Sequence, residues 1–308
     1  MRAEGKAGGI VDGSSGEGEG ASVRARARRQ AVSAAAGRGR RRELARSPAR
    51  REQRLVFVVG SPRSGTTFLG RALGGLPGFL DLGEAPPLRA LLPRLAVPSA
   101  GSIAAEDVAA VRIRGVLERI RRFGFARQLR CVAQTPEMAF FVPALARAYP
   151  DVRVIHLLRD GRDVASSLLE QGWLRFARQV RGDAGLGWGS HRPLWVEPER
   201  ASEFEQASEA TRAAWAWRAY VTAARNPQPA GLEIRYEQMA ADPTGTATLI
   251  ASHLEIPAAL LDRPLSRAHP RSVGRFRREL SSTQLREVER EAGGLLAELG
   301  YGRETTGV

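Results

Sequence analysis

The chain has 308 residues, of which 43% are hydrophobic and 26% charged, a composition typical of a globular protein with a sizeable core. Its formal net charge is +14, and its single cysteine, Cys131, excludes an internal disulfide and argues against a cysteine-rich zinc site. Because no run approaches the roughly 18 apolar residues of a membrane-spanning helix, the sequence excludes an integral membrane protein, and we expect a cytoplasmic one.

Residues 1–53 are predicted to be a disordered Arg/Gly/Ala-rich leader. They contain 13 Lys and Arg residues against 6 Asp and Glu residues, with almost no large apolar residue before Leu44. Such a segment cannot bury enough surface to offset the entropy cost of ordering it. An inert leader is the leading interpretation, and an arm for nucleic acid or acidic lipid and a targeting segment are the alternatives. No specific nucleic-acid partner is expected.

From Arg54 onward the sequence predicts alternating strands and helices. The strands are the apolar run Leu55–Val59 and the segments 129–134, 152–158 and 231–236. Helices are predicted at 66–73, 106–123, 137–148, 205–224, 244–253 and 282–299, with Pro136 opening one of them and Asp163 capping another. This alternation predicts an α/β fold, a P-loop-type three-layer sandwich with a central, mostly parallel sheet. The domain would cover residues 54–302 and leave a short tail, 303–308.

A glycine-rich loop follows the first predicted strand, Gly-Ser-Pro-Arg-Ser-Gly-Thr-Thr at 60–67. Its glycines have the spacing of a nucleotide-binding P-loop, but Thr66 stands where that loop has lysine. Backbone N–H groups that lead into a helix N-terminus bind anions, and Arg63 adds a side-chain cation. The hydroxyl groups of Ser64, Thr66 and Thr67 are further donors. The loop therefore predicts a site for a phosphate-like group.

Polar residues also follow the other predicted strands, at 134–135, 159–162 and 236–237. Ligands of open parallel sheets bind beyond the carboxyl ends of the strands. All four segments are therefore expected at one crevice.

The run Pro62–Thr67 (PRSGTT) resembles the 5′-phosphosulfate loop of sulfotransferases that use 3′-phosphoadenosine 5′-phosphosulfate (PAPS). In that family a later strand is followed by an arginine and, eight residues on, by a helical serine; Arg159 and Ser167 stand in these places. Tyr236 matches a residue that packs near the nucleotide. The resemblance covers about residues 55–302, and it is similar to the tyrosylprotein and related bacterial branch, which has arginine at the position of Arg63.

The resemblance implies a set of roles. Pro62, Arg63, Ser64, Gly65, Thr66 and Thr67 would hold the 5′-phosphosulfate end of PAPS as co-substrate, while Arg159 and Ser167 would hold the 3′-phosphate. Ser272 and Arg275, in a later basic turn, would add a nucleotide contact beside Tyr236. Glu84 would be the general base. Gln134 occupies the place of a lysine that assists the leaving oxygen in this branch, and no metal is required.

The leading interpretation is a sulfotransferase acting on a hydroxyl group of a protein tyrosine, a carbohydrate or a small metabolite. A P-loop kinase and a non-catalytic or weakly active nucleotide or polyanion binder are the alternatives, the latter because glutamine at 134 brings no charge. The segment 173–204, with Trp173, Trp188 and Trp195, is predicted to form an acceptor pocket or lid. The acceptor is not identified, and a homodimer is left open.

Overall fold

The computed structural model describes residues 55–95, 102–126, 129–174, 193–225 and 231–302, all within one compact unit, Ser47–Val308. The leader 1–53, Trp188 and the tail 303–308 lie outside the described residues. Within the described ranges, no helix has both the length and the apolar character needed to cross a membrane.

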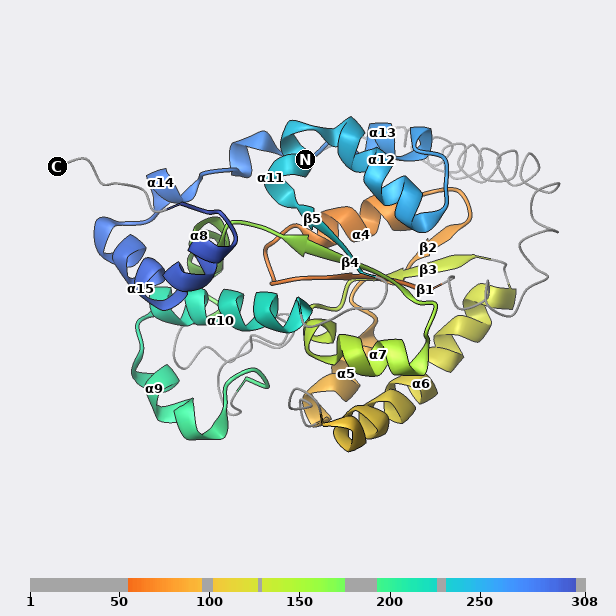
Figure 1. Ribbon diagram of the computed structural model, residues 1–308, viewed down its shortest axis with the longest axis horizontal. Coiled ribbons are helices and arrows are strands. Elements are labelled where there is room, and N and C mark those ends of the chain that lie inside the picture. Colours follow the sequence, from red (N-terminus) through yellow and green to blue (C-terminus); the bar gives the residue numbers. More distant parts are fainter. Residues whose placement is uncertain (1–54, 96–101, 127–128, 175–192, 226–230, 303–308) are drawn as a thin grey trace, which may run out of the picture. The chain divides into compact units, whose positions relative to one another are not determined.

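Five parallel strands form the central sheet (Figure 1), in the order β2–β3–β1–β4–β5. Phe57 in β1 pairs with Ala133 in β3 on one side and with Val154 in β4 on the other. Because the strand order reverses around β1, a crevice for a ligand is expected at its carboxyl end. The strands are β1 (Leu55–Val59), β2 (Phe79–Asp81), β3 (Arg130–Ala133), β4 (Arg153–Leu158) and β5 (Gly231–Arg235).

The side chains of β1 alternate between two cores, one on each face of the sheet. Leu55, Phe57 and Val59 lie in one apolar cluster, and Val56 and Val58 lie in the other. The first face is covered by α5 (Pro86–Leu91), α6 (Ile103–Ala126), α7 (Val142–Ala148), α8 (Gly161–Gln171), α10 (Glu209–Ala224) and α15 (Ser282–Glu298). The second is covered by α4 (Thr66–Gly74), α11 (Tyr236–Ala241), α12 (Pro243–Leu254) and α13 (Ala259–Leu265) (Figure 1). The predicted α/β sandwich with a parallel sheet is confirmed.

Shorter elements connect these layers. They are the 3₁₀ helices η1 (Leu92–Arg94), η2 (Pro136–Phe141), η3 (Pro198–Arg200) and η4 (Pro270–Ser272), together with α9 (Ala201–Gln206) and α14 (Phe276–Glu279). The helix predicted at 137–148 is thus divided into η2 and α7. The helix predicted at 205–224 is divided into α9 and α10, because the hydroxyl of Ser208 accepts the N–H of Thr211 and caps a new helix.

The predicted cap of α8 at Asp163 is wrong. Asp160 caps this helix, and its carboxylate accepts the N–H of Arg162 at 2.9 Å. Asp163 is instead fully buried one turn later, where it accepts the N–H groups of Gly274 (2.8 Å) and Phe276 (3.1 Å). The helix begins directly after β4, so the capping position falls three residues earlier than expected and Asp163 is left for a distant segment.

Candidate active site

The loop between β1 and α4 has the backbone geometry of an anion site. Arg63 and Gly65 have positive φ angles of 70° and 96°, and Gly65 precedes α4 without any side chain that caps the helix. The first turn of α4 therefore lacks the side-chain acceptor that helix N-termini commonly use. The hydroxyl of Ser64 is fully buried and has no hydrogen-bond partner among the described residues. An incoming anion would satisfy both the turn and this hydroxyl.

Tyr236 leaves no room for a side chain at position 65. A Cβ at this position would lie 2.8 Å from the ring of Tyr236, the first residue of α11. The phenol of Tyr236 donates to the carbonyl of His269 at 3.3 Å. Tyr236 thus packs directly against the loop.

Arg63 and Ser167 are 104 residues apart in the sequence but are in contact in the structure. The Nε of Arg63 donates to the Oγ of Ser167 on α8 at 2.9 Å. Trp173, at the start of the segment expected to form an acceptor pocket or lid, lies with its ring centroid 5.4 Å from the guanidinium of Arg63. Most of that segment, 175–192, lies outside the described residues. The two regions expected to hold the two ends of a donor therefore share one site.

Arg159 connects this loop with three other segments. Its guanidinium donates to the carbonyl of Arg63 at 3.1 Å and to the carbonyl of Ser272, and it lies 4.6 Å above the ring of Tyr236. Its own carbonyl accepts the indole N–H of Trp217, on α10, at 3.0 Å. The side chain is buried, and its Nε has no partner within the part of the chain that the structure describes. A fixed, buried guanidinium with an unused donor suits an anionic ligand.

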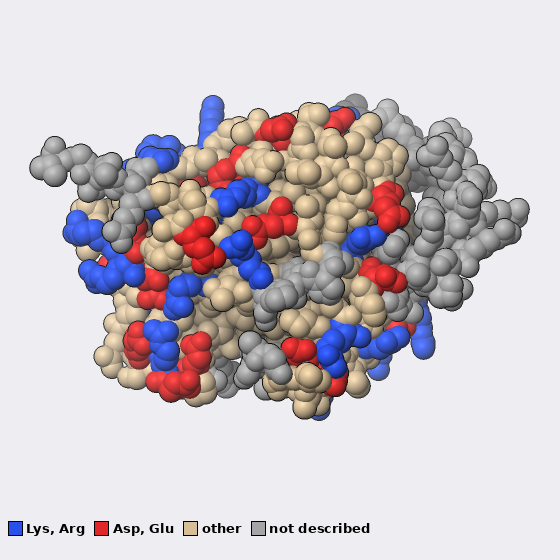
Figure 2. Space-filling view, viewed as in Figure 1, with Lys and Arg blue, Asp and Glu red and all other residues tan. Residues whose placement is uncertain are grey.

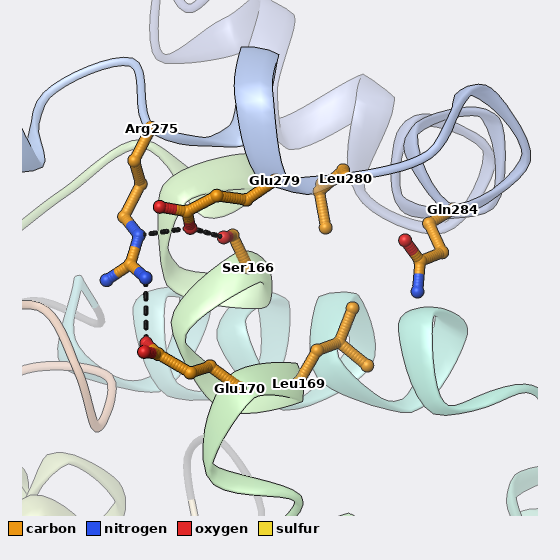
Figure 3. Close-up of a pocket in the computed structure, with 7 residues that line it drawn as sticks. All are labelled: Ser166, Leu169, Glu170, Arg275, Glu279, Leu280 and Gln284. Atoms are coloured by element: carbon orange, nitrogen blue, oxygen red, sulfur yellow. Dashed lines mark hydrogen bonds and ion pairs between the residues drawn. The ribbon is translucent and has the colours of Figure 1, made fainter.

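The basic turn at 271–275, expected to add a nucleotide contact, lies next to Arg159 and α8. Ser272 contacts Arg159 through its backbone carbonyl. The guanidinium of Arg275 is held by Glu170 at 2.7 Å and by Glu279 at 2.5 Å (Figure 3). Arg275 therefore has a carboxylate partner on each of two segments, α8 and α14.

The pKa of Arg63 reflects the charges around it. Burial lowers this pKa, and the positive charges of Arg275 and Arg159 lower it further, whereas the negative charge of Glu170 raises it. Such a group of cations is matched by a ligand with several negative charges. On the face that Figure 2 shows, basic and acidic residues are interspersed.

A groove of about 890 Å³ begins beside the same loop. Thr67 and Phe68, at the start of α4, line it on one side. The other lining residues are Arg71, Ala72, Gly75, Arg263, Pro264, Arg267 and His269. Thr67 is exposed, whereas Pro62 and Thr66 are buried in the loop. The groove offers an aromatic ring and several cations at the edge of the anion site.

Glu84 lies in the turn after β2, and its neighbours fix it from two sides. Its carboxylate forms an ion pair with Arg89 at 2.7 Å, and its backbone carbonyl accepts the hydroxyl of Thr135 at 2.7 Å. Its side chain is 32% exposed, so an acceptor can reach it. The Glu84 carboxylate is therefore half-buried and held in a fixed place near the end of β3.

Gln134 is buried beside this turn. Its N–H donates to the carbonyl of Gly83 at 2.9 Å, which places the ends of β2 and β3 next to each other. Its side chain lies against α4, where a Cβ at Gly70 would be 3.0 Å from its Oε1. That oxygen has no hydrogen-bond partner among the residues that the structure describes. Gln134 therefore lies between α4 and the turn that carries Glu84.

Sequence reasoning missed two residues of this half of the site, Arg89 and Glu137. Glu137 is 1% exposed, in η2, and burial raises the pKa of its carboxyl while the charge of Arg89 opposes the shift. Tyr220 of α10 lies nearby, because its ring centroid is 4.8 Å from that of Phe140 in η2. The sequence Gln-Thr-Pro-Glu at 134–137 carried the signal, since a carboxylate one residue after a helix-opening proline lies near the strand end. No cluster of three or more possible metal ligands occurs among the residues that the structure describes.

Comparison with solved structures gives matches of low sequence identity. A sulfotransferase domain from the curacin biosynthetic pathway is 17% identical, with a TM-score of 0.46, and the match covers 78% of this chain and 96% of that one. A sulfotransferase domain from the Synechococcus PCC 7002 olefin synthase is 18% identical, with a TM-score of 0.44 and coverage of 78% and 94%. The sulfotransferase STF1 from Mycobacterium tuberculosis H37Rv is 18% identical, with a TM-score of 0.42 and coverage of 78% and 76%. No curated protein matches this chain in sequence.

A family model also matches the sequence of this chain. Residues 56–259 match the model of the sulfotransferase family, a span that includes the loop after β1, Glu84, Gln134, Arg159 and Ser167. Since this span is well over half of the chain, the protein belongs to the sulfotransferase family.

Proposed function

We propose that this sulfotransferase moves a sulfuryl group from PAPS to the hydroxyl group of an acceptor. One observation carries the proposal: Arg63 donates to Ser167 at 2.9 Å, and Arg159 donates to the carbonyl of Arg63 at 3.1 Å. The residues assigned by resemblance to the two ends of the donor are therefore in direct contact. A donor with a phosphosulfate at one end and a 3′-phosphate at the other matches this pairing in charge.

The chemistry of the site fits such a donor. The uncapped N-terminus of α4, with Arg63 and the buried hydroxyl of Ser64, would bind the 5′-phosphosulfate. Arg159, whose Nε has no partner, would bind the 3′-phosphate together with Ser167 and distinguish PAPS from ATP. The adjoining groove with Phe68 offers an aromatic ring for the nucleoside.

Glu84 would act as the general base for the transfer. Its carboxylate would take the hydroxyl proton of the acceptor while the acceptor oxygen forms a bond to sulfur. The bond between sulfur and the bridging oxygen would break in line with this attack, and the electron pair would leave with the 3′,5′-bisphosphate product. Arg89 would keep the carboxylate of Glu84 in place through its 2.7 Å ion pair. Such a reaction depends on positioning and on charge stabilisation by Arg63.

The test combines binding with transfer of labelled sulfate. The wild-type protein should bind 3′-phosphoadenosine 5′-phosphate by calorimetry, should not bind ATP, and should transfer label from PAPS to one of a panel of tyrosyl peptides, sugars and small hydroxyl compounds. Glu84→Gln should lower kcat by roughly 10²- to 10⁴-fold, because a general base contributes about that much, and should leave nucleotide affinity unchanged. Glu255→Gln is the matched control, since Glu255 also pairs with an arginine at 2.7 Å, and it should keep full activity. Unchanged turnover in Glu84→Gln would remove Glu84 from the mechanism.

A non-catalytic nucleotide binder is the second candidate, and Gln134 is the observation that favours it. A neutral amide replaces a charged donor where charge would develop on the leaving oxygen. Tight binding of the bisphosphate without transfer to any acceptor would support this candidate. Binding of ATP in place of the bisphosphate would support the P-loop kinase.

A further inference from the structure

One face of α8 carries a row of polar side chains. Asp163, Ser166, Ser167 and Glu170 are separated by three, one and three residues, so they project from the same side of the helix. Asp163 and Ser166 contact the segment that follows η4, through backbone N–H groups and through Glu279. Ser167 contacts Arg63. This face therefore joins the donor loop to the basic turn.

Glu170 ends this row, and its carboxylate accepts from the guanidinium of Arg275 at 2.7 Å (Figure 3). The Glu170 side chain is 58% exposed, whereas that of Arg275 is only 18% exposed. The second carboxylate on Arg275, Glu279, is also bound by the hydroxyl of Ser166. The two glutamates thus differ, because Glu279 belongs to a network and Glu170 reaches the guanidinium from the solvent side.

Glu170 also acts on the donor loop. Its charge raises the pKa of Arg63, against the effects of burial and of the neighbouring Arg275 and Arg159. A cavity of about 360 Å³ lies between α8 and the residues around Arg275, with Ser166 and Glu170 among its lining (Figure 3). The Glu170 carboxylate is therefore an anion placed between cations of the proposed donor site, with space beside it.

We propose that Glu170 is a specificity-determining residue that occupies Arg275 in competition with the 3′-phosphate of the donor. This inference rests on the proposed function, since it requires a donor with a 3′-phosphate. An exposed ion pair contributes little to stability, whereas a phosphate group binds arginine through two parallel hydrogen bonds. On binding, Arg275 exchanges the carboxylate of Glu170 for the phosphate and keeps Glu279. Glu170 thereby weakens the hold on 3′-phosphorylated nucleotides and helps the bisphosphate product to leave.

The test measures nucleotide binding by calorimetry in the absence of any acceptor. The probes are 3′-phosphoadenosine 5′-phosphate and adenosine 5′-phosphosulfate, which lacks the 3′-phosphate. Glu170→Gln should bind the bisphosphate roughly two- to five-fold more tightly, the range expected from loss of one exposed ion pair, and should bind the second probe as the wild type does. Glu255→Gln makes the same change in net charge at another arginine-paired glutamate, and it should alter neither affinity. In an Arg275→Gln background, Glu170→Gln should have no further effect.

Unchanged or weaker binding of the bisphosphate by Glu170→Gln would overturn the inference, and so would equal tightening toward both probes. A wild-type protein that binds both probes equally would refute the proposed donor itself. A wild-type preference for the bisphosphate that Glu170→Gln leaves unaltered would refute only the role of Glu170.

Discussion

Replacing Asp163 with asparagine should weaken both the fold and the donor site, although Asp163 is not expected to touch the donor. Its carboxylate accepts two backbone N–H groups, from Gly274 at 2.8 Å and from Phe276 at 3.1 Å, and lies 3.8 Å from the guanidinium of Arg159. Asparagine can accept one of these bonds and presents an amide N–H to the other. The loss of one charge-assisted hydrogen bond and the unsatisfied donor that remains should cost about 2–4 kcal/mol.

This cost has two measurable consequences. The melting temperature should fall by roughly 4–16 °C, since a domain of this size loses about 2–4 °C per kcal/mol. Affinity for 3′-phosphoadenosine 5′-phosphate should fall more than affinity for adenosine 5′-phosphosulfate, because Asp163 positions the turn that contacts Arg159. Asp242→Ala is the control, since Asp242 caps α12 by accepting the N–H of Gly245 at 2.8 Å, and loss of this cap should lower stability without changing the preference. Wild-type melting and wild-type nucleotide preference in Asp163→Asn would refute the reasoning.

Two further predictions concern the acceptor half of the site. Gln134→Lys should raise kcat about tenfold or more at unchanged affinity for the bisphosphate, because a cation would then face the leaving oxygen; an unchanged kcat with intact binding would count against that placement. Glu137→Gln should stabilise the fold increasingly as pH rises. Burial raises the pKa of Glu137, so its contribution to stability is complete below the ordinary glutamate value of about 4.3 and is lost as pH rises through the higher folded-state value. The free energy of unfolding of both proteins, measured with denaturant across this pH range, tests this prediction. A stability difference between Glu137→Gln and the wild type that does not vary with pH would contradict it.

Local patterns were sufficient for the central part of the fold. β1 is a continuous apolar run followed by a glycine-rich loop, and both features act within a few residues. The rule that parallel strands present their carboxyl ends at one edge then predicted that Arg63 and Arg159 would be neighbours. β2 was missed because it has three residues, none of them fully buried, and so shows no apolar run.

The parts that could not be predicted depend on contacts between distant segments. Asp163 was mistaken for a cap because its partners, Gly274 and Phe276, are 111 and 113 residues away. The ion pair of Arg275 with Glu170 could not be foreseen, because Glu170 lies 105 residues earlier in the chain. Charge pairs of this kind have no local signature, and they decide which of several plausible basic residues is available to a ligand.

Helix α10 touches both halves of the proposed reaction. Trp217 holds the carbonyl of Arg159, and Tyr220, one turn later, packs against η2 beside Glu137. A rotation or shift of α10 would move Trp217 and Tyr220 together, and with them the contacts to Arg159 and to η2. Efforts to redirect the protein toward new acceptors should therefore leave α10 untouched, because a change there would disturb the nucleotide side as well.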